Sequence, residues 1–271
     1  MNDRRNDNRG EKRFDKRRAP AAPVEEVEGQ LEGRNALTEA IRAGRAIDKV
    51  FIASGEIDKG LQRLAAEAKE AGAVVVPVDR RKLDAMSFTR AHQGVITMVA
   101  AHEYCTIDDI LAEAASRGEE PLIVICDELS DPHNLGAIMR SAECAGAHGV
   151  IIPKRRSVGL TATVAKSSAG AIEYMKVARV TNINNAINEL KEKGVWIFGT
   201  AAEGSIPMYK ANLKVPAALV IGNEGDGMST LVRKNCDVTV SIPLKGRISS
   251  LNASAAASIL LYEAVRQRLG E

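Results

Sequence analysis

One stretch decides the fold of this chain: Ala217-Ala-Leu-Val-Ile-Gly-Asn-Glu-Gly-Asp-Gly227. Its uninterrupted apolar run predicts a fully buried strand, which passes directly into a polar, glycine-containing loop. A second β-rich run, residues 238–242, leads into a polar loop ending in Ser249-Ser-Leu-Asn252 and then into a small-residue helix over residues 253–268. Such loops are expected side by side at one edge of a parallel sheet, where α/β proteins bind their ligands.

Strand and helix patterns alternate on both sides of this stretch. Further strands are predicted at residues 122–127, 149–153, 175–180 and 195–199, with helices at 137–145 and 182–193. This spacing predicts a mostly parallel sheet with helices on both faces. Upstream, helices at 34–43 and 58–71 and strands at 49–53, 73–78 and 94–100 predict a small α/β sandwich. We therefore expect a tail at 1–27, a small domain at 28–104, a linker at 105–120 and a main domain at 121–271.

Composition supports a globular, cytosolic protein. The chain has 271 residues, 45% of them hydrophobic and 27% charged, which is enough to form two modest cores. Aromatic residues are only 3%, so Val, Ile, Leu and Ala must build these cores. No apolar run approaches the roughly 20 residues of a membrane span, and no secretory segment is visible. Four scattered cysteines argue against a zinc site and against a disulfide framework.

Charge is unevenly distributed. The net charge is +2, but residues 1–20 carry eight Lys or Arg against four acids, which leaves the remainder slightly acidic. Residues 1–27 also lack apolar periodicity and end in an Ala/Pro-rich run, so we predict a disordered tail. It is either a flexible arm that contacts RNA phosphates or a solubilising segment.

Three polar clusters end strands of the main domain: Asn134 to Arg140, Gly222 to Gly227, and Ile242 to Asn252. Each alone is a weak signal, since a glycine-rich hexamer can be an ordinary turn. The hexamer is neither the GxGxxG of a dinucleotide fold nor a GxxxxGK phosphate loop, which disfavours an ordinary nucleotide-dependent oxidoreductase or hydrolase. In this order, each after a strand, the three clusters are far more specific.

The sequence resembles the SpoU or TrmH branch of the SPOUT RNA ribose methyltransferases. The family's three motifs match Asp131-Pro-His-Asn-Leu-Gly-Ala-Ile-Met-Arg140, Ile221-Gly-Asn-Glu-Gly-Asp-Gly227, and Ile242-Pro-Leu with Ser249-Ser-Leu-Asn-Ala-Ser-Ala-Ala256. Residues 28–103, opening with Glu32-Gly-Arg-Asn-Ala-Leu-Thr-Glu-Ala40, resemble an L30e-type substrate-binding domain. The resemblance implies a trefoil-knotted catalytic domain, S-adenosylmethionine as cofactor, and a homodimer with its active site near the interface.

The resemblance also implies roles for individual residues. The expected cofactor contacts are Gly222, Ile242 and Leu251, with Thr200 and Asn223 beside them; the expected catalytic residues are Arg140, Asn134, Glu224, Ser250 and Asn252. Arg140 is the central residue of the family's site, sometimes assigned as a base. An arginine is hard to deprotonate, so we expect it to bind a phosphate and stabilise the developing alkoxide. Simpler structural roles remain open, with Asn134 and Asn252 as helix caps and Glu224 as a loop brace.

RNA contacts are expected at the basic triplet Lys154-Arg155-Arg156, which follows a strand, and at Arg34 of the small domain. The closest group in the resemblance comprises the bacterial enzymes that methylate a guanosine 2′-hydroxyl of 23S rRNA. A tRNA 2′-O-methyltransferase and a catalytically silent RNA-binding protein are the alternatives. No metal ion and no membrane are expected to take part.

Overall fold

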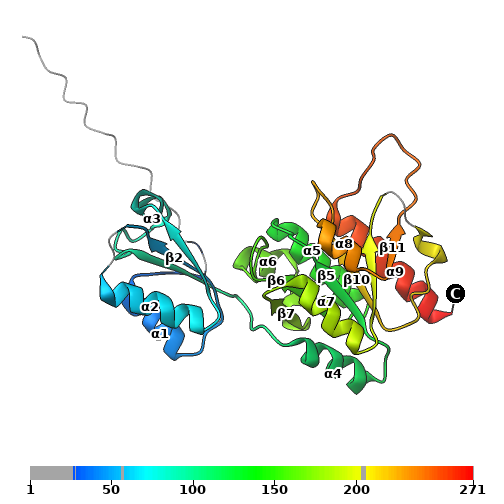
Figure 1. Cartoon of the computed structure of the whole chain (residues 1–271), viewed down its shortest axis with the longest axis horizontal. Helices are drawn as coiled ribbons and strands as arrows, with labels where there is room; N and C mark the ends of the chain where they lie inside the picture. The colour runs from blue at the N-terminus through cyan, green and yellow to red at the C-terminus, as the bar shows by residue number, and fades with distance from the viewer. Residues whose placement is uncertain (1–26, 28, 56–57, 203–205, 271) are drawn as a thin grey trace, which may run out of the picture.

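The computed structural model describes residues 27, 29–55, 58–202 and 206–270, which form a smaller N-terminal and a larger C-terminal domain (Figure 1). Apart from Val27, the predicted tail lies outside the described residues. The N-terminal domain contains β1 (Gln30–Glu32), α1 (Arg34–Arg42), β2 (Ile47–Ala53), α2 (Lys59–Glu70), β3 (Val74–Val78), α3 (Arg80–Met86) and β4 (Val95–Val99).

The C-terminal domain begins with α4 (Ile107–Arg117), β5 (Leu122–Cys126), α5 (Pro132–Cys144), β6 (Gly149–Pro153), α6 (Ala162–Ser167), η1 (Ala171–Glu173), β7 (Val177–Val180) and α7 (Ile183–Glu192). It continues with β8 (Trp196–Thr200), β9 (Ile206–Pro207), η2 (Met208–Lys210), β10 (Ala217–Ile221), α8 (Thr230–Asn235), β11 (Val238–Ser241) and α9 (Ala253–Leu269). The strand and helix alternation predicted from sequence is thus present in both domains.

The N-terminal domain is a four-stranded mixed sheet in the order β1-β4-β2-β3 with helices on both faces. Only β2 and β3 run parallel, and β4 is antiparallel to both of its neighbours. Helices α1 and α2 bury Leu37 and Leu61 against Val95 of β4. On the other face, α3 buries Leu83 against Ile96. Successive residues of β4 therefore serve opposite faces, as the two-residue period of a strand requires.

The C-terminal domain is a seven-stranded sheet in the order β7-β6-β5-β10-β8-β11-β9, and every neighbouring pair in it is parallel. β10 lies between β5 and β8, with Ala217 opposite Leu122 and Ile221 opposite Cys126. All residues of β5, β6 and β10 are buried. The unbroken apolar runs of these strands follow from this burial, because a strand covered on both faces has no polar side.

Helices cover both faces of this sheet. Along β10, Leu219 and Ile221 belong to the core shared with α5 and α9, while Ala218 and Val220 belong to the core shared with α4, α7 and α8. The polar segment predicted as the linker forms α4, whose apolar side is buried in the second of these cores. Its Ile110 packs so closely on β6 that a side chain at Gly149 would lie 2.6 Å from it.

Helix α5 begins five residues earlier than the predicted start at residue 137. Asp131 is the N-cap and accepts a hydrogen bond from the His133 amide at 2.8 Å, and Pro132 occupies the first helical position. An Asp followed by Pro is a helix start signal, because proline needs no amide partner there. The earlier start changes the positions of Asn134 and Arg140, which now lie in the first and third turns.

A buried ion pair joins the two domains. Arg179 of β7 contacts Asp48 of β2 at 2.9 Å, and both side chains are only 6% exposed. The same guanidinium donates to the main-chain oxygens of Ile47 and Asp48, while the Tyr104 hydroxyl donates to the Asp48 carboxylate at 2.6 Å. Burial raises the pKa of Asp48. Gly159 leaves the space that this contact needs, since a Cβ added at Gly159 would lie 2.3 Å from the Asp48 carboxylate.

Membrane-spanning helices and groups of metal-ligating side chains are absent from the described residues. Every helix in these ranges is too short or too polar to pass through a lipid bilayer. In the same ranges, no three His, Cys, Asp or Glu side chains are grouped closely enough to bind a metal ion. All four cysteines are free; Cys126 is buried and Cys105 and Cys236 are half-buried, whereas Cys144 is exposed.

Candidate active site

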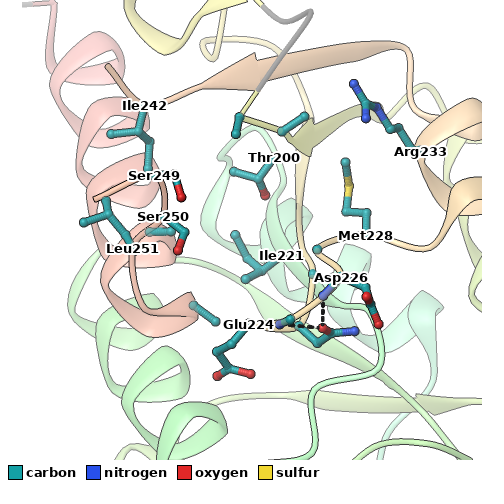
Figure 2. Close-up of a pocket in the computed structure, with 18 of the residues that line it drawn as sticks. Thr200, Ile221, Glu224, Asp226, Met228, Arg233, Ile242, Ser249, Ser250 and Leu251 are labelled. Carbon is teal, nitrogen blue, oxygen red and sulfur yellow. Dashed lines mark hydrogen bonds between the residues drawn. The ribbon is translucent and has the colours of Figure 1, made fainter. Parts of the chain in front are cut away.

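A cavity of about 400 Å³ opens where β8, β10 and β11 end (Figure 2). Three separate segments line it: residues 200–202 after β8, residues 221–228 after β10, and residues 242–256 after β11, the last in part. Arg233 of α8 adds a cationic side chain to the wall. The carboxyl ends of neighbouring parallel strands thus bring together loops that are up to about 50 residues apart, as α/β folds do at their ligand sites.

The loop after β10 is a tight, self-bonded turn. Asn223 and Gly227 exchange two main-chain hydrogen bonds, each 3.1 Å long. The Asn223 side chain accepts hydrogen bonds from the amides of Gly225 and Asp226, at 2.9 and 2.8 Å (Figure 2). Asn223 therefore shapes the loop with both its main chain and its side chain, a common use of Asn in turns.

Gly222 is required by this turn. A Cβ at this position would lie 2.1 Å from the carbonyl carbon of Gly227 and 2.2 Å from the nitrogen of Met228. The family resemblance implied a cofactor contact at Gly222, where a missing side chain allows close approach. In the structure, the close approach is made by the loop's own returning backbone.

The three polar clusters meet at Asn134. The Asn134 amide nitrogen donates to the Glu224 carboxylate, and its amide oxygen accepts from Asn252 Nδ2 at 2.9 Å. Asn134 is buried, whereas Glu224 and Asn252 are exposed at the rim. Residues 90 and 118 positions apart in the chain are thereby connected through one side chain.

Two of these residues also carry structural roles. Asn252 caps α9, with its side-chain oxygen accepting from the Ser254 and Ala255 amides at 2.9 and 3.3 Å. Only its Nδ2 group is left to act on Asn134. Asn134 itself is not a helix cap, because Asp131 fills that position.

Arg140 is not brought to the cavity within one chain. It lies in the third turn of α5, is exposed, and is absent from the cavity lining. Among the described residues it makes no hydrogen bond or ion pair. It follows Asn134 by six positions, which places it about 9 Å further along the helix and about 240° around it. Within one subunit, Arg140 therefore does not contribute to the cavity.

The other predicted cofactor residues lie along the cavity. Thr200, Asn223, Ile242, Leu251 and Gly222 all line it, as does Ser250. Figure 2 shows Ser249, Ser250 and Leu251 on the side of the cavity next to α9. The Thr200 hydroxyl donates to the main-chain oxygen of Val220, so only its acceptor side is available to a ligand.

Sequence reasoning missed Met228 and Arg233. Both line the cavity, and both follow the glycine-rich loop without a recognisable motif. Met228 lies against Gly199, where an added Cβ would be 2.8 Å from the methionine methyl carbon. The only sequence signal for these two residues was that they follow a loop that itself follows a buried strand. Such a loop contributes residues to a site from both sides of its turn. The neighbouring Cys236 is no nucleophile, because burial raises the pKa of its thiol to about 11.

The predicted RNA contacts lie apart from the cavity. Lys154, Arg155 and Arg156 follow β6 at the same edge of the sheet, and Arg156 is paired with Glu128 at 3.0 Å. Arg34, at the start of α1, forms a two-pronged pair with Asp58 at 3.0 and 2.6 Å. Of these four basic residues, Arg155 has the side chain that is exposed and, within the described ranges, not paired.

Comparison with known proteins identifies the family. Residues 121–262 match the SpoU rRNA Methylase family, and residues 30–105 match the domain described as RNA 2′-O ribose methyltransferase substrate binding. The chain belongs to the SpoU methylase family. It is an RNA 2′-O-ribose methyltransferase with an N-terminal substrate-binding domain.

Relatives and solved structures agree with this assignment. YacO of Bacillus subtilis, named as a TrmH family tRNA/rRNA methyltransferase, is 47% identical over 87% of this chain and 94% of its own length. The SpoU methyltransferase AviRb of Streptomyces viridochromogenes, crystallised with S-adenosylmethionine, is 27% identical with a TM-score of 0.58, covering 89% of this chain and 91% of that one. An rRNA methyltransferase of Sinorhizobium meliloti, also with the cofactor bound, is 25% identical with a TM-score of 0.55, covering 88% and 87%. The similarity therefore extends over both domains.

Proposed function

We propose that this SpoU methylase transfers a methyl group from S-adenosylmethionine to the ribose 2′-hydroxyl of a guanosine in 23S rRNA, in the cytoplasm. The family description, rRNA methylase, supports a ribosomal target. The observation that carries the proposal is the junction of Asn134, Glu224 and Asn252 at the rim of the cavity. Three motifs that are far apart in sequence form one polar site beside a space of cofactor size.

The cavity fits S-adenosylmethionine. Its volume of about 400 Å³ lies within the range of small-molecule sites, roughly 300–1,000 Å³. Ile242 and Leu251 supply apolar wall for an adenine ring, and Gly222 and Asn223 hold the loop that closes the cavity. The loops after β10 and β11 are also the segments that the trefoil knot implied by the family resemblance would interlace. The cofactor supplies an electrophilic methyl group attached to a positively charged sulfur.

The polar junction positions the acceptor ribose. Asn252 is fixed by its cap to α9, and it fixes Asn134, which in turn fixes one oxygen of Glu224. Because each member is held by the next, the second Glu224 oxygen has a defined position at the rim, and the Ser250 hydroxyl lines the same cavity. We assign them to binding the ribose hydroxyls, since a ribose held in one orientation lowers the entropic part of the barrier.

Arg140 completes the site from a second copy of the chain. It is exposed on α5, which packs against α9, and α9 carries the exposed apolar residues Ile259 and Tyr262. A homodimer formed through these two helices buries that apolar surface and allows Arg140 of one copy to approach the cavity of the other. There its guanidinium binds the phosphate beside the reacting nucleotide and stabilises the alkoxide that forms as the hydroxyl proton passes to that phosphate or to water.

Transfer of tritiated methyl groups from labelled S-adenosylmethionine to total RNA tests the activity. Arg140→Ala should abolish transfer, because it removes the guanidinium that we assign to the phosphate and to the developing alkoxide. Calorimetry should show unchanged cofactor affinity. Arg63→Ala, an exposed arginine of α2, is the matched control and should transfer normally. Near-normal turnover by Arg140→Ala would refute the role of Arg140, and no transfer by the wild-type protein would favour a silent RNA-binding protein.

Mapping ribose methylation in a strain that lacks this chain tests the target. We expect one 2′-O-methylguanosine of 23S rRNA to disappear while tRNA methylation stays unchanged. A tRNA target is the alternative, since the relatives are named for tRNA and rRNA together. Loss of a methyl group from a tRNA instead would establish that alternative.

The basic triplet after β6 supports binding of an RNA chain next to the site. Lys154 and Arg155 lie at the same sheet edge as the cavity, whereas Arg156 is partly neutralised by Glu128. Replacing Lys154 and Arg155 by Gln should lower the slope of log affinity against log salt by about two if each contacts one phosphate. An unchanged slope would leave the triplet without a role in RNA binding.

A further inference from the structure

A second cavity, of about 460 Å³, lies in the N-terminal domain, well away from the candidate active site. Its lining comes from five parts of the domain: Arg34 of α1, Ala53 of β2, Asp58 and Leu61 around the start of α2, Arg80 of α3, and Gln93 and Gly94 before β4. We infer that this cavity binds one nucleotide of the RNA substrate, turned out of its base stack. The inference rests on the proposed action on RNA and adds a binding site to it.

The wall of the cavity contains a rigid, planar ion pair. Arg34 donates through Nη1 and Nη2 to the two carboxylate oxygens of Asp58, at 3.0 and 2.6 Å. Its Nε donates to the main-chain oxygen of Gln93 at 3.3 Å, and Asp58 is further held by the amide of Leu61 at 3.0 Å. Three of the five N–H groups of the guanidinium are therefore used to fix its plane. A fixed guanidinium plane is a stacking surface for an unpaired base.

Gln93 is held in an unusual conformation that presents its amide group. Its φ angle is +51°, in the left-handed region that non-glycine residues seldom occupy. The Arg34 amide donates to the Gln93 side-chain oxygen at 3.1 Å, which retains the side chain at the cavity. The Gln93 NH₂ group has no acceptor among the described residues, so two donors remain for the edge of a base. Backbone strain of this kind concentrates at functional sites.

Arg80 supplies the charge that a nucleotide requires. Its side chain is exposed, and within the described ranges it forms no ion pair or hydrogen bond. Because Arg34 and Asp58 neutralise each other, Arg80 leaves the cavity with a net positive charge suited to a phosphate. Leu61 and Ala53 add apolar surface beneath the base. A planar surface, amide donors and one unpaired guanidinium match the base and phosphate of a single nucleotide.

The size and openness of the site favour RNA over a free nucleotide. A volume of about 460 Å³ suits one nucleotide and excludes a duplex. Asp58, Arg80 and Gln93 are all exposed at the rim, so a polymer chain can enter and leave on either side. The domain itself matches the substrate-binding domain of RNA ribose methyltransferases. Single-stranded loops, whose bases can leave the stack, are the usual targets of such pockets.

Two variants of the full chain test the site. Arg80→Ala removes the phosphate contact, and Gln93→Asn shortens the amide while keeping a residue that tolerates a positive φ. Arg81→Ala is the matched control, because it removes the same charge from the same helix at a position outside the cavity lining. Fluorescence anisotropy measures binding of a labelled RNA stem-loop and of a blunt duplex with the same stem.

We expect Arg80→Ala and Gln93→Asn each to weaken stem-loop binding about tenfold, the scale of one lost stacking or bidentate contact. Duplex binding should change no more than it does in Arg81→Ala. The inference is overturned if both variants bind the stem-loop as tightly as Arg81→Ala does. It is also overturned if they lose as much affinity for the duplex as for the stem-loop. Calorimetric binding of guanosine monophosphate to the wild type, with stem-loop affinity unaffected by the variants, would identify a free-nucleotide site and also overturn it.

Methyl transfer separates this inference from the proposed function. In the pocket variants, we expect the KM for RNA to rise while kcat at saturating RNA and the affinity for S-adenosylmethionine stay unchanged. If the wild type methylates RNA and the variants match it in KM, the pocket fails and the function stands. If the wild type transfers no methyl group but the variants selectively lose the stem-loop, the function fails and the pocket stands.

Discussion

Replacing Gly222 by alanine should disable the cofactor cavity. The added Cβ would lie 2.1, 2.2 and 2.4 Å from three main-chain atoms of Gly227 and Met228, whereas ordinary contacts begin at 3.4 Å. The obstructing atoms belong to the backbone, so no side-chain rotation can relieve the overlap. The turn between Asn223 and Gly227 must move by more than about 1 Å, and this turn forms one wall of the cavity.

The loss of stability in Gly222→Ala can be estimated from typical overpacking costs and from the hydrogen bonds of the turn that would be strained. Overpacking typically costs about 1–3 kcal/mol, and the two main-chain bonds between Asn223 and Gly227 contribute about 1 kcal/mol each. We expect the free energy of unfolding to fall by about 1–3 kcal/mol in Gly222→Ala, measured by urea denaturation. Displacement of the wall should weaken S-adenosylmethionine binding at least about tenfold in calorimetry, the equivalent of about 1.4 kcal/mol.

Gly225→Ala is the control within the same loop. Its Cβ would meet only the side-chain oxygen of Asn223, at an ordinary distance of 3.5 Å. Both stability and cofactor affinity should remain close to those of the wild type. Wild-type affinity in Gly222→Ala would refute the argument that this close approach holds the cavity in shape, and an equal loss in both variants would show that any change in the loop suffices.

Two further predictions concern buried charge. Burial lowers the pKa of His148 below its ordinary 6.5, and its Nδ1 accepts the Leu122 amide at 3.0 Å, so the unfolded chain binds a proton that the folded chain excludes. The contribution of neutral His148 to the free energy of unfolding should therefore be complete above about pH 7 and should be lost as the pH decreases through the lowered pKa. His148→Gln should flatten this change, measured by urea unfolding between about pH 8 and about pH 5. An unchanged pH dependence in the variant would contradict the assignment. Arg179→Leu leaves Asp48 buried without its cation and should lower the free energy of unfolding by about 3–5 kcal/mol. Adding Asp48→Asn to the same chain should restore part of this loss. If the effects of the two substitutions are simply additive in a double-mutant cycle, the pair is not coupled.

Local signals in the sequence predicted much of the fold. The apolar runs predicted β6 and β10 with the bounds that the structure shows. Because these strands are completely buried, all their residues are apolar, and the run begins and ends with the strand. The start of α5 was placed too late, although Asp131-Pro132 is itself a start signal. The apolar period of α4, carried by Ile107, Ile110 and Ala114, shows that a segment that connects two domains in sequence can belong to the core of one of them.

The candidate site likewise has features that the sequence predicted and features that only the structure shows. Residue type and order in the three motifs carried the resemblance to the family, and that resemblance implied the residues that were expected at the cavity. Which residues touch could not be predicted, because the contacts of Asn134 with Glu224 and Asn252 depend on how β5, β10 and α9 are placed. Arg140 is an example, since the sequence could not show that this exposed residue of α5 is absent from the cavity lining of its own subunit.

The sequence by itself determined that this chain has buried parallel strands ending in polar loops, with the motifs of a SpoU methylase, because strand burial and turn chemistry act over a few neighbouring residues. The tertiary structure alone decided that Gly222 accommodates its own returning loop, that Asn134 joins the three motifs, and that Arg34, Gln93 and Arg80 surround a second cavity. Those features arise from contacts between segments distant in the chain, and such contacts exist only once the strands have been ordered and the helices packed on them.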